Sequence, residues 1–215
     1  MSYIVEYYVA ENQQAHYSFL FDETIAHSPK HMRFVVERNA IMNVEILIAR
    51  TPLNIHIECI LQGEGADARI AGIYMGHMAD AITITTMQHH KACHTRSNLV
   101  MKGILHDTAW AHYQGNVRIE QDAHGTVASQ ENKNILLSNA ARAVSVPSLE
   151  VLNHDVQCSH GSAIGKFDEE QILYAAARGI DEKTAQHLLL QAFCADLFTD
   201  EKLKKQMSIL LESYI

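Results

Sequence analysis

The sequence predicts an all-β body that is followed by a C-terminal helical segment. Short runs in which apolar residues alternate with others at period two recur from Met32 onward, as expected of strands. Between Leu53 and Ile164 no run has the 3.6-residue periodicity of a convincing helix, whereas apolar residues recur at helical spacing near the C-terminus. We therefore predict a strand-rich core over residues 1–165 and a helical segment over residues 166–215.

The breaks between these runs favour a parallel β-helix, although a sandwich or a barrel also fits the alternation. A sandwich needs hairpin turns, and the sequence contains no Asn-Gly, Asp-Gly or Gly-Gly pair. Single small or polar residues instead suit the tight corners of a chain that keeps turning in one direction. The residues that we assign to such corners are Gly103, Asp107, Gly115, Asp122, Gly125, Asn134 and Asn139. No strict repeat accompanies them.

The strand runs begin weakly and then become regular. Residues 3–9 alternate as a short strand would, but we expect the stretch 1–31 as a whole to be an irregular N-terminal segment of the core. In the run 54–61, His56 and Glu58 share one face because they are two residues apart. The other predicted strand runs are 32–37, 43–50 (followed by a Thr51-Pro52 break), 68–75, 81–88, 99–105, 110–113, 117–120, 126–129, 135–138, 143–146 and 149–152.

Three helices are predicted in the C-terminal segment. Asp168 can cap the first, which Gly179 ends, and Asp181 can cap the second, which extends to about residue 198. A third follows over about 200–214. The apolar stripe of the second helix comprises Ala185, Leu188, Leu189, Ala192, Phe193 and Leu197, and that of the third comprises Leu203, Met207, Leu210, Leu211 and Tyr214. The end of a narrow strand body cannot bury all of these stripes, so either a partner covers part of them or the helices form a self-contained cap.

Cys158 and His160 are the first candidate site residues. They are separated by one residue, so on a strand their side chains leave the same face. A thiolate and an imidazole that converge in this way suit a transition metal or an iron–sulfur intermediate better than a hard cation. The alternative is that Cys158 is an inert buried thiol and His160 a hydrogen-bonded surface residue.

A second group of candidate ligands lies in the segment that contains His89, His90, Cys93 and His94. On a strand His90 and His94 would share one face, and His89 and Cys93 the other, so pairs are feasible but a four-ligand cage is not. A stand-alone zinc protein built on these residues is one alternative function. The simpler interpretation is a polar strand or loop without a metal.

Composition and motifs exclude several classes of function. The net charge of -8 and a pI near 5.9 leave no basic surface for nucleic acid or anionic membranes. No signal peptide and no apolar run of membrane-spanning length occurs, so we expect a cytoplasmic protein that has no membrane association. The four cysteines, none in a Cys-x-x-Cys pair, are expected to be free thiols. The chain also lacks nucleotide-phosphate loops and a Gly-x-Ser-x-Gly elbow.

Six ordered motifs resemble the core of the SufB/SufD family, over a stretch from about Leu61 to Phe193. The fifth contains Cys158-Ser-His160-Gly161, a form that is similar to the SufD branch. The six motifs lie at 97–107, 115–119, 128–137, 143–150, 155–161 and 174–180. Family members are usually longer, with an N-terminal helical region that this sequence does not contain.

The resemblance implies a right-handed parallel β-helix with a C-terminal α-helical segment and a non-enzymatic scaffold role in SUF iron–sulfur cluster assembly. It implies pairing with a SufB-like scaffold or with a second copy as a homodimer, and docking of a SufC-like ABC ATPase on the helical segment. Carried over by position, Cys158 and His160 would lie at the scaffold interface, where a transient cluster or iron is handled without a stably bound cofactor. The residues expected to contact the ATPase are Tyr174, Arg178, Gly179, Leu189 and Phe193. A β-helix enzyme acting on carbohydrates or in acyl transfer is the alternative from another class.

Overall fold

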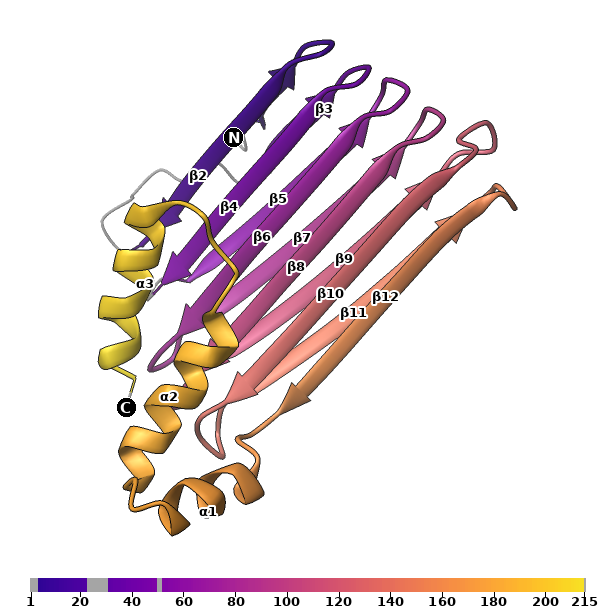
Figure 1. Cartoon of the computed structure of the whole chain (residues 1–215). Coiled ribbons are helices and arrows are strands. Elements are labelled where there is room, and N and C mark those ends of the chain that lie inside the picture. Colours follow the sequence, from indigo (N-terminus) through magenta and orange to yellow (C-terminus); the bar gives the residue numbers. More distant parts are fainter. Residues whose placement is uncertain (1–3, 23–30, 50–51, 215) are drawn as a thin grey trace.

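The chain folds as a parallel β-helix made of two six-stranded sheets (Figure 1). A computed structural model describes residues 4–22, 31–49 and 52–214. One sheet contains β1 (Ile4–Val9), β3 (His31–Val36), β5 (Leu53–Leu61), β7 (Ala81–His90), β9 (Trp110–Ile119) and β11 (Arg142–Val151). The other contains β2 (Gln14–Phe21), β4 (Ile41–Ala49), β6 (Asp67–Gly76), β8 (Arg96–Leu105), β10 (Thr126–Leu136) and β12 (Val156–Gly165). Because successive strands alternate between the sheets, neighbours within a sheet run parallel, and the β-helix expected from the resemblance is confirmed.

The N-terminal segment is more regular than expected. The stretch 1–31, predicted to be irregular, contains β1 and β2, which form the first turn of the solenoid. Aromatic side chains fill this turn: the ring of Tyr7 stacks on Phe34 with centroids 4.9 Å apart, and Tyr17 lies 5.1 Å from Tyr7. Stacked and tilted aromatic pairs of this kind stabilise the turn beyond the area that they bury. Tyr3, Arg50 and Thr51, which entered the sequence predictions, lie outside the described residues.

The predicted corners are only partly correct. Asp107, Asp122, Gly125 and Asn139 lie in turns or bends between strands. Gly103, Gly115 and Asn134 instead lie inside β8, β9 and β10. The runs predicted on either side of Gly115, and those on either side of Asn134, are therefore single strands. The glycines face the interior, where a Cβ at Gly103 would collide with the ring of Tyr74, and one at Gly115 with the amide of Gln130. These positions lack a side chain because a larger one fills the same space, from the neighbouring strand at Gly103 and from the opposite sheet at Gly115.

Gly103→Ala is therefore expected to lower the free energy of unfolding by about 2 kcal/mol, since the added methyl group meets Tyr74 and Asn134. The matched control is Gly165→Ala at the end of β12, where an added Cβ has nothing within 4 Å, and this change should stay within about 0.5 kcal/mol of wild type. Urea denaturation followed by circular dichroism measures both. Equal effects at the two glycines would contradict the packing argument.

Three helices follow the last strand: α1 (Glu169–Ala177), α2 (Glu182–Cys194) and α3 (Glu201–Glu212). Asp168 and Asp181 cap the first two through hydrogen bonds to backbone N–H groups, as predicted. Gly179 has a φ of +79°, and its N–H donates to the Ala176 carbonyl while that of Ile180 donates to Ala175, which is the Schellman arrangement. No helix within the described ranges has the length and hydrophobicity needed to span a bilayer.

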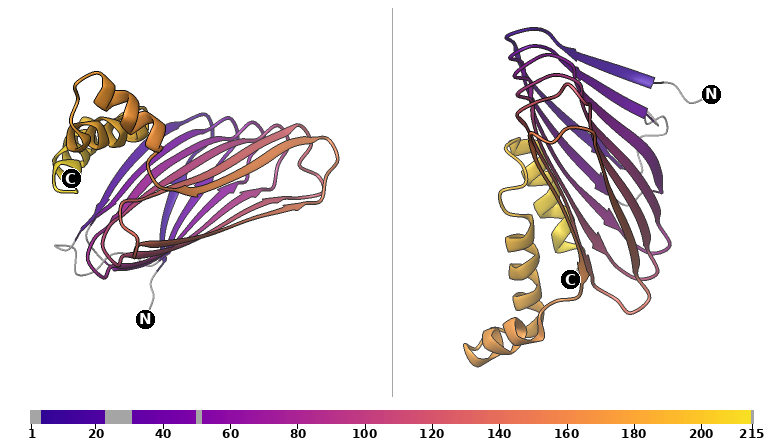
Figure 2. Two further views of the ribbon diagram at one scale, coloured as in Figure 1. Left: turned by 90° about the horizontal axis from the view of Figure 1, so that it is seen from below. Right: turned by 90° about the vertical axis from the view of Figure 1, so that its right-hand side faces the viewer.

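The helices cover a face of the second sheet, not the end of the solenoid (Figure 2). α2 and α3 pack on the outward side chains of β4, β6 and β8, whereas α1 buries no residue. The stripe predicted for α3 is confirmed. The stripe predicted for α2 is wrong in part: Leu190 and Cys194 are buried, while Leu188 and Ala192 are exposed. α2 ends at Cys194, so Leu197 of the predicted stripe lies beyond the helix. The α2 residues that pack on the sheet, Leu190 and Cys194, are four positions apart.

Buried and cationic side chains of the sheet anchor the helices. Glu45 on β4 is completely buried and accepts hydrogen bonds from the backbone N–H groups of Thr199 and Asp200, at 2.7 and 2.9 Å. Lys102 donates to the Phe193 carbonyl at 2.5 Å, and Arg69 to the Leu197 carbonyl at 2.9 Å. Because the carbonyl end of a helix carries partial negative charge, Lys102 supplies the cation that the last turn of α2 lacks. Arg69 instead holds the segment that follows α2, in which Leu197 lies.

Candidate functional site

The C-terminal end of the solenoid is open. β11 and β12 are the last strands of their sheets, and within the described residues no further strand pairs with them (Figure 1). β12 contains no Asp, Glu, Lys or Arg, and Val144, Val146 and Ile164 are each exposed by more than two-fifths of their surface. Charged side chains normally protect an edge strand from pairing with another chain. β12 therefore lacks the protection that edge strands usually have.

Cys158 and His160 lie on the inner face of β12, side by side as the spacing predicts. Their register partners on β10 are Ala128 and Gln130, whose side chains are buried in the solenoid interior. Cys158 is half-buried against Ala128 and Leu149, and His160 is exposed. Among the described residues, no third metal-ligating side chain joins this pair. The chain thus places one thiol and one imidazole side by side at its open end.

The interior becomes polar toward this end. One register column of the second sheet reads Val44, Ile70, Leu99, Gln130 and His160. Gln130 is 2% exposed, and neither its amide nitrogen nor its amide oxygen has a hydrogen-bond partner. Leaving a buried amide unpaired is costly, so this group is an unusual feature of the open end. A hollow of about 300 Å³ beside it is lined by His160, Ser159 and Asn98, among others.

Sequence reasoning missed Gln130 and its neighbours. Every residue from Ser129 to Asn134 is polar, so the alternation of faces cannot be seen there. The structure places Asn132 and Asn134 inward with Gln130. Asn132 donates to the Tyr74 hydroxyl at 3.1 Å, and Asn134 to the Asn132 side chain at 2.8 Å. The available signal was the absence of glycine or proline between residues 126 and 136, a stretch that is long enough to form one continuous strand.

The histidine-rich segment does not form a metal site. His90 is buried inside the solenoid, where its ring nitrogens bond to Thr95 and Ser97 at 2.8 Å each. Burial, together with neighbouring His89, lowers the pKa of His90 to about 4, so its imidazole is neutral. His89 faces outward to Glu120 at 2.7 Å, and Cys93 donates to the Asp122 carbonyl. No three of His89, His90, Cys93 and His94 bring ligand atoms within 4.8 Å of one another, which removes the basis for the zinc alternative.

The residues expected to contact the ATPase are divided between two surfaces. Tyr174 on α1 is 64% exposed and lines a groove of about 520 Å³ together with Leu188 and Leu189 of α2. The guanidinium of Arg178 lies over the Tyr174 ring, 5.1 Å from its centroid. Gly179 ends α1 and so directs the chain into α2. Phe193 lies elsewhere: it packs toward the sheet, with the Lys102 ammonium 5.0 Å from its ring.

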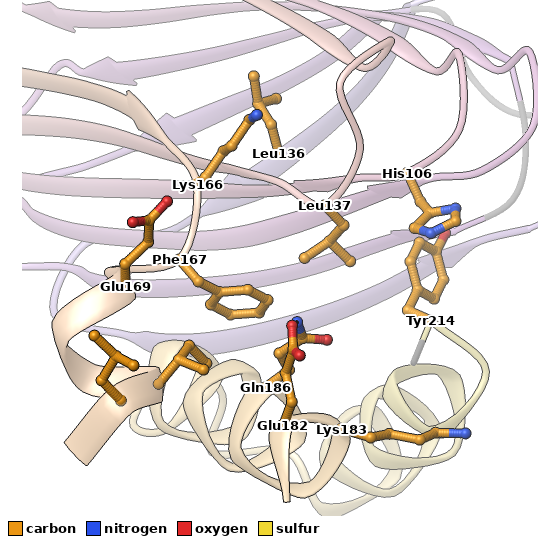
Figure 3. Close-up of a pocket in the computed structure, with 12 residues that line it drawn as sticks. His106, Leu136, Leu137, Lys166, Phe167, Glu169, Glu182, Lys183, Gln186 and Tyr214 are labelled. Atoms are coloured by element: carbon orange, nitrogen blue, oxygen red, sulfur yellow. The ribbon is translucent and has the colours of Figure 1, made fainter. Parts of the chain in front are cut away.

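A larger cleft of about 810 Å³ separates α1 and α2 from the ends of the strands (Figure 3). Phe167 points into the cleft from one side, and Leu137 from the turn after β10. His106 lies beside Tyr214 at the far end, as the close-up shows. Charged residues of both signs, Lys166, Glu169, Glu182 and Lys183, also line it.

Comparison with known proteins identifies the family of the chain. The family model described as "SUF system FeS cluster assembly, SufBD core domain" matches residues 1–193. The chain belongs to the SufBD family. The SufBD chain is 29% identical to the SufD protein of Escherichia coli K12 over 196 residues, which cover 89% of this chain and 46% of that protein. A SufBD family protein of Mycobacterium leprae is 27% identical over 188 residues, covering 82% of this chain and 47% of that protein.

A SufBD family protein of Synechocystis is 35% identical over a shorter match of 104 residues, covering 48% of this chain and 23% of that protein. The SufBD chain thus spans about half the length of the first two relatives. Its match to the E. coli SufD protein agrees with the branch indicated by the Cys158-Ser-His160-Gly161 motif.

Proposed function

We propose that this SufBD chain is a non-enzymatic scaffold subunit of SUF iron–sulfur cluster assembly, and that it pairs through its open end. The observation that carries the proposal is the coincidence of three features at the open end: the uncharged free edge of β12, the Cys158 and His160 side chains on its inner face, and the unpaired Gln130 amide on β10 beneath them. A partner that extends the solenoid would cover the edge. It would also complete the ligand set.

The cargo follows from the ligand chemistry. Thiolate and imidazole are the ligands of iron and of iron–sulfur clusters. Cys158 and His160 would hold the cluster, or its iron, transiently at the interface between two scaffolds. Gln130 lies one turn deeper and would bond to the incoming group or to the partner. The partner is a second copy of the chain or a homologous SufB-like scaffold.

The groove between α1 and α2 is the surface that we assign to a SufC-like ABC ATPase. Its apolar lining includes Leu189 and the exposed side chains of Tyr174 and Leu188. α1 buries none of its residues, so this side of the groove does not pack on the sheet. An exposed apolar groove of this kind is typical of a protein-binding surface. Nucleotide-driven movement of the ATPase would then reach β12 through residues 166–168, which connect β12 to α1.

The test is anaerobic co-expression of the tagged chain with its ATPase and a longer SufB-like homologue, followed by native mass spectrometry of the purified material. A complex that contains the ATPase is expected. Its mass distinguishes self-pairing from pairing with the homologue. A chain that purifies as a monomer, free of both proteins, would contradict the proposal.

The double variant Cys158→Ser, His160→Ala is expected to keep the complex but to lose cluster formation. His160 is exposed and Cys158 is only partly buried at the edge of the core, so the fold should persist. The measurement is the visible absorption and iron content of the anaerobically reconstituted complex, with Cys93→Ser as the matched control because Cys93 is also a partly exposed thiol. Wild-type cluster content in the double variant would exclude these residues as ligands.

A further inference from the structure

The outer face of the first sheet carries a second group of ligand atoms, far from the open end in strand order. His31 on β3 and His56 on β5 are register partners, and Glu58 lies two residues beyond His56 on the same face. One ligand atom from each residue lies within 4.8 Å of the other two. The imidazole rings of His31 and His56 are 4.4 Å apart and nearly perpendicular, so that they do not stack. Adjacent strands thus bring the three side chains to one point.

One ring nitrogen of this group is left without a hydrogen-bond partner. The Nε2 atom of His31 is buried and has no hydrogen-bond partner, although it lies 3.4 Å from a Glu58 oxygen. An unpaired imidazole nitrogen that faces a carboxylate points to a missing ligand.

We propose that His31, His56 and Glu58 form a binding site for a divalent first-row transition-metal ion. Two imidazoles and one carboxylate are the donor set that Zn²⁺ and Fe²⁺ accept when other positions stay open to solvent. Arg33 donates to Glu58 Oε2 at 2.7 Å and thereby orients the carboxylate, as the outer partners of metal ligands commonly do. The site is independent of Cys158 and His160 and of the scaffold function proposed above.

The test uses the tag-free full chain with Cys158→Ser and His160→Ala as parent, so that the open end contributes neither of its two ligands. Zn²⁺ is titrated by calorimetry, and Co²⁺ by visible absorption. His56→Gln and Glu58→Gln should each lose one equivalent of bound metal or weaken its affinity at least about tenfold. Gln preserves size and hydrogen bonding, and circular dichroism verifies that each variant is folded. Differences from the parent are measured because His77, His106 and Asp107 form another group of neighbouring ligand atoms.

The matched control is His89→Gln. His89 faces outward from β7 on the same sheet and contacts Glu120 at 2.7 Å, but no third ligand joins that pair within the described residues. Its replacement should leave the number and affinity of bound ions unchanged. Two results would overturn the site: a parent that binds no Zn²⁺ or Co²⁺, or His56→Gln and Glu58→Gln variants that bind both metals as the parent does.

Discussion

Glu45→Ala is expected to lower the free energy of unfolding by about 3 kcal/mol or more and to release α3 from the sheet. The carboxylate is completely buried, and one of its oxygens accepts from both the N–H and the hydroxyl of Thr199, at 2.7 Å each. The other accepts from the Asp200 N–H at 2.9 Å. Alanine would leave these donors unpaired at the start of α3. Limited proteolysis between α2 and α3, together with urea denaturation, measures the two effects.

The matched control is Glu64→Ala, because Glu64 is an exposed residue in the turn before β6. Its replacement should change stability by less than about 0.5 kcal/mol. If Glu45→Ala behaved like this control, the buried carboxylate would not be the anchor of the helices.

The same contact gives the stability a defined pH dependence. Burial raises the pKa of Glu45, but the hydrogen bonds from Thr199 and Asp200 and the nearby His16 bring it below the ordinary value of 4.5. A carboxyl whose pKa is lower in the folded than in the unfolded state stabilises the fold above the unfolded pKa. That contribution disappears as the pH falls through the folded pKa. The difference in stability between wild type and Glu45→Ala should therefore narrow below pH 4.5.

Ile164→Lys is expected to abolish pairing at the open end while leaving the chain folded. Ile164 is 44% exposed on the inner face of β12, so a lysine at this position can reach solvent in the single chain. In a paired scaffold the same ammonium would be buried without a counter-charge, which costs several kcal/mol. The association constant should fall at least about 100-fold, as measured by sedimentation velocity.

Ile209→Lys provides the control for this change. Ile209 is 51% exposed on α3, on the helical side of the molecule and away from the free edges. The Ile209→Lys variant should therefore pair with the same association constant as the wild type. Loss of pairing in both variants, or in neither, would argue against β12 as the interface.

Much of the fold could be predicted because its signals are local. The period-two runs identify strands, and the aspartates before each helix identify where helices begin, since both depend on neighbouring residues. Strand continuity could not be predicted at Gly115 or Pro147. Both look like breaks, yet they are register partners inside β9 and β11. Proline is tolerated there because β11 is the edge of its sheet.

The candidate site, too, could be predicted from the sequence only in part. That Cys158 and His160 share a face follows from their spacing. That this face is the inner one, beneath which Gln130 lies unpaired, follows only from the stacking of β12 on β10. The structure likewise separates Phe193, which packs on Lys102, from Tyr174 and Leu189 in the exposed groove.

The sequence by itself determined the division into strands and helices, the helix caps and which side chains leave a strand together. These properties depend on residues within a few positions of one another, where backbone geometry leaves little choice. The tertiary structure decided which face is buried, which strands remain at the open end, and that His31 meets His56 and Glu58 across two strands. Those outcomes depend on contacts between residues about 25 to 30 positions apart, and local periodicity carries no information about which turns of the solenoid lie next to each other.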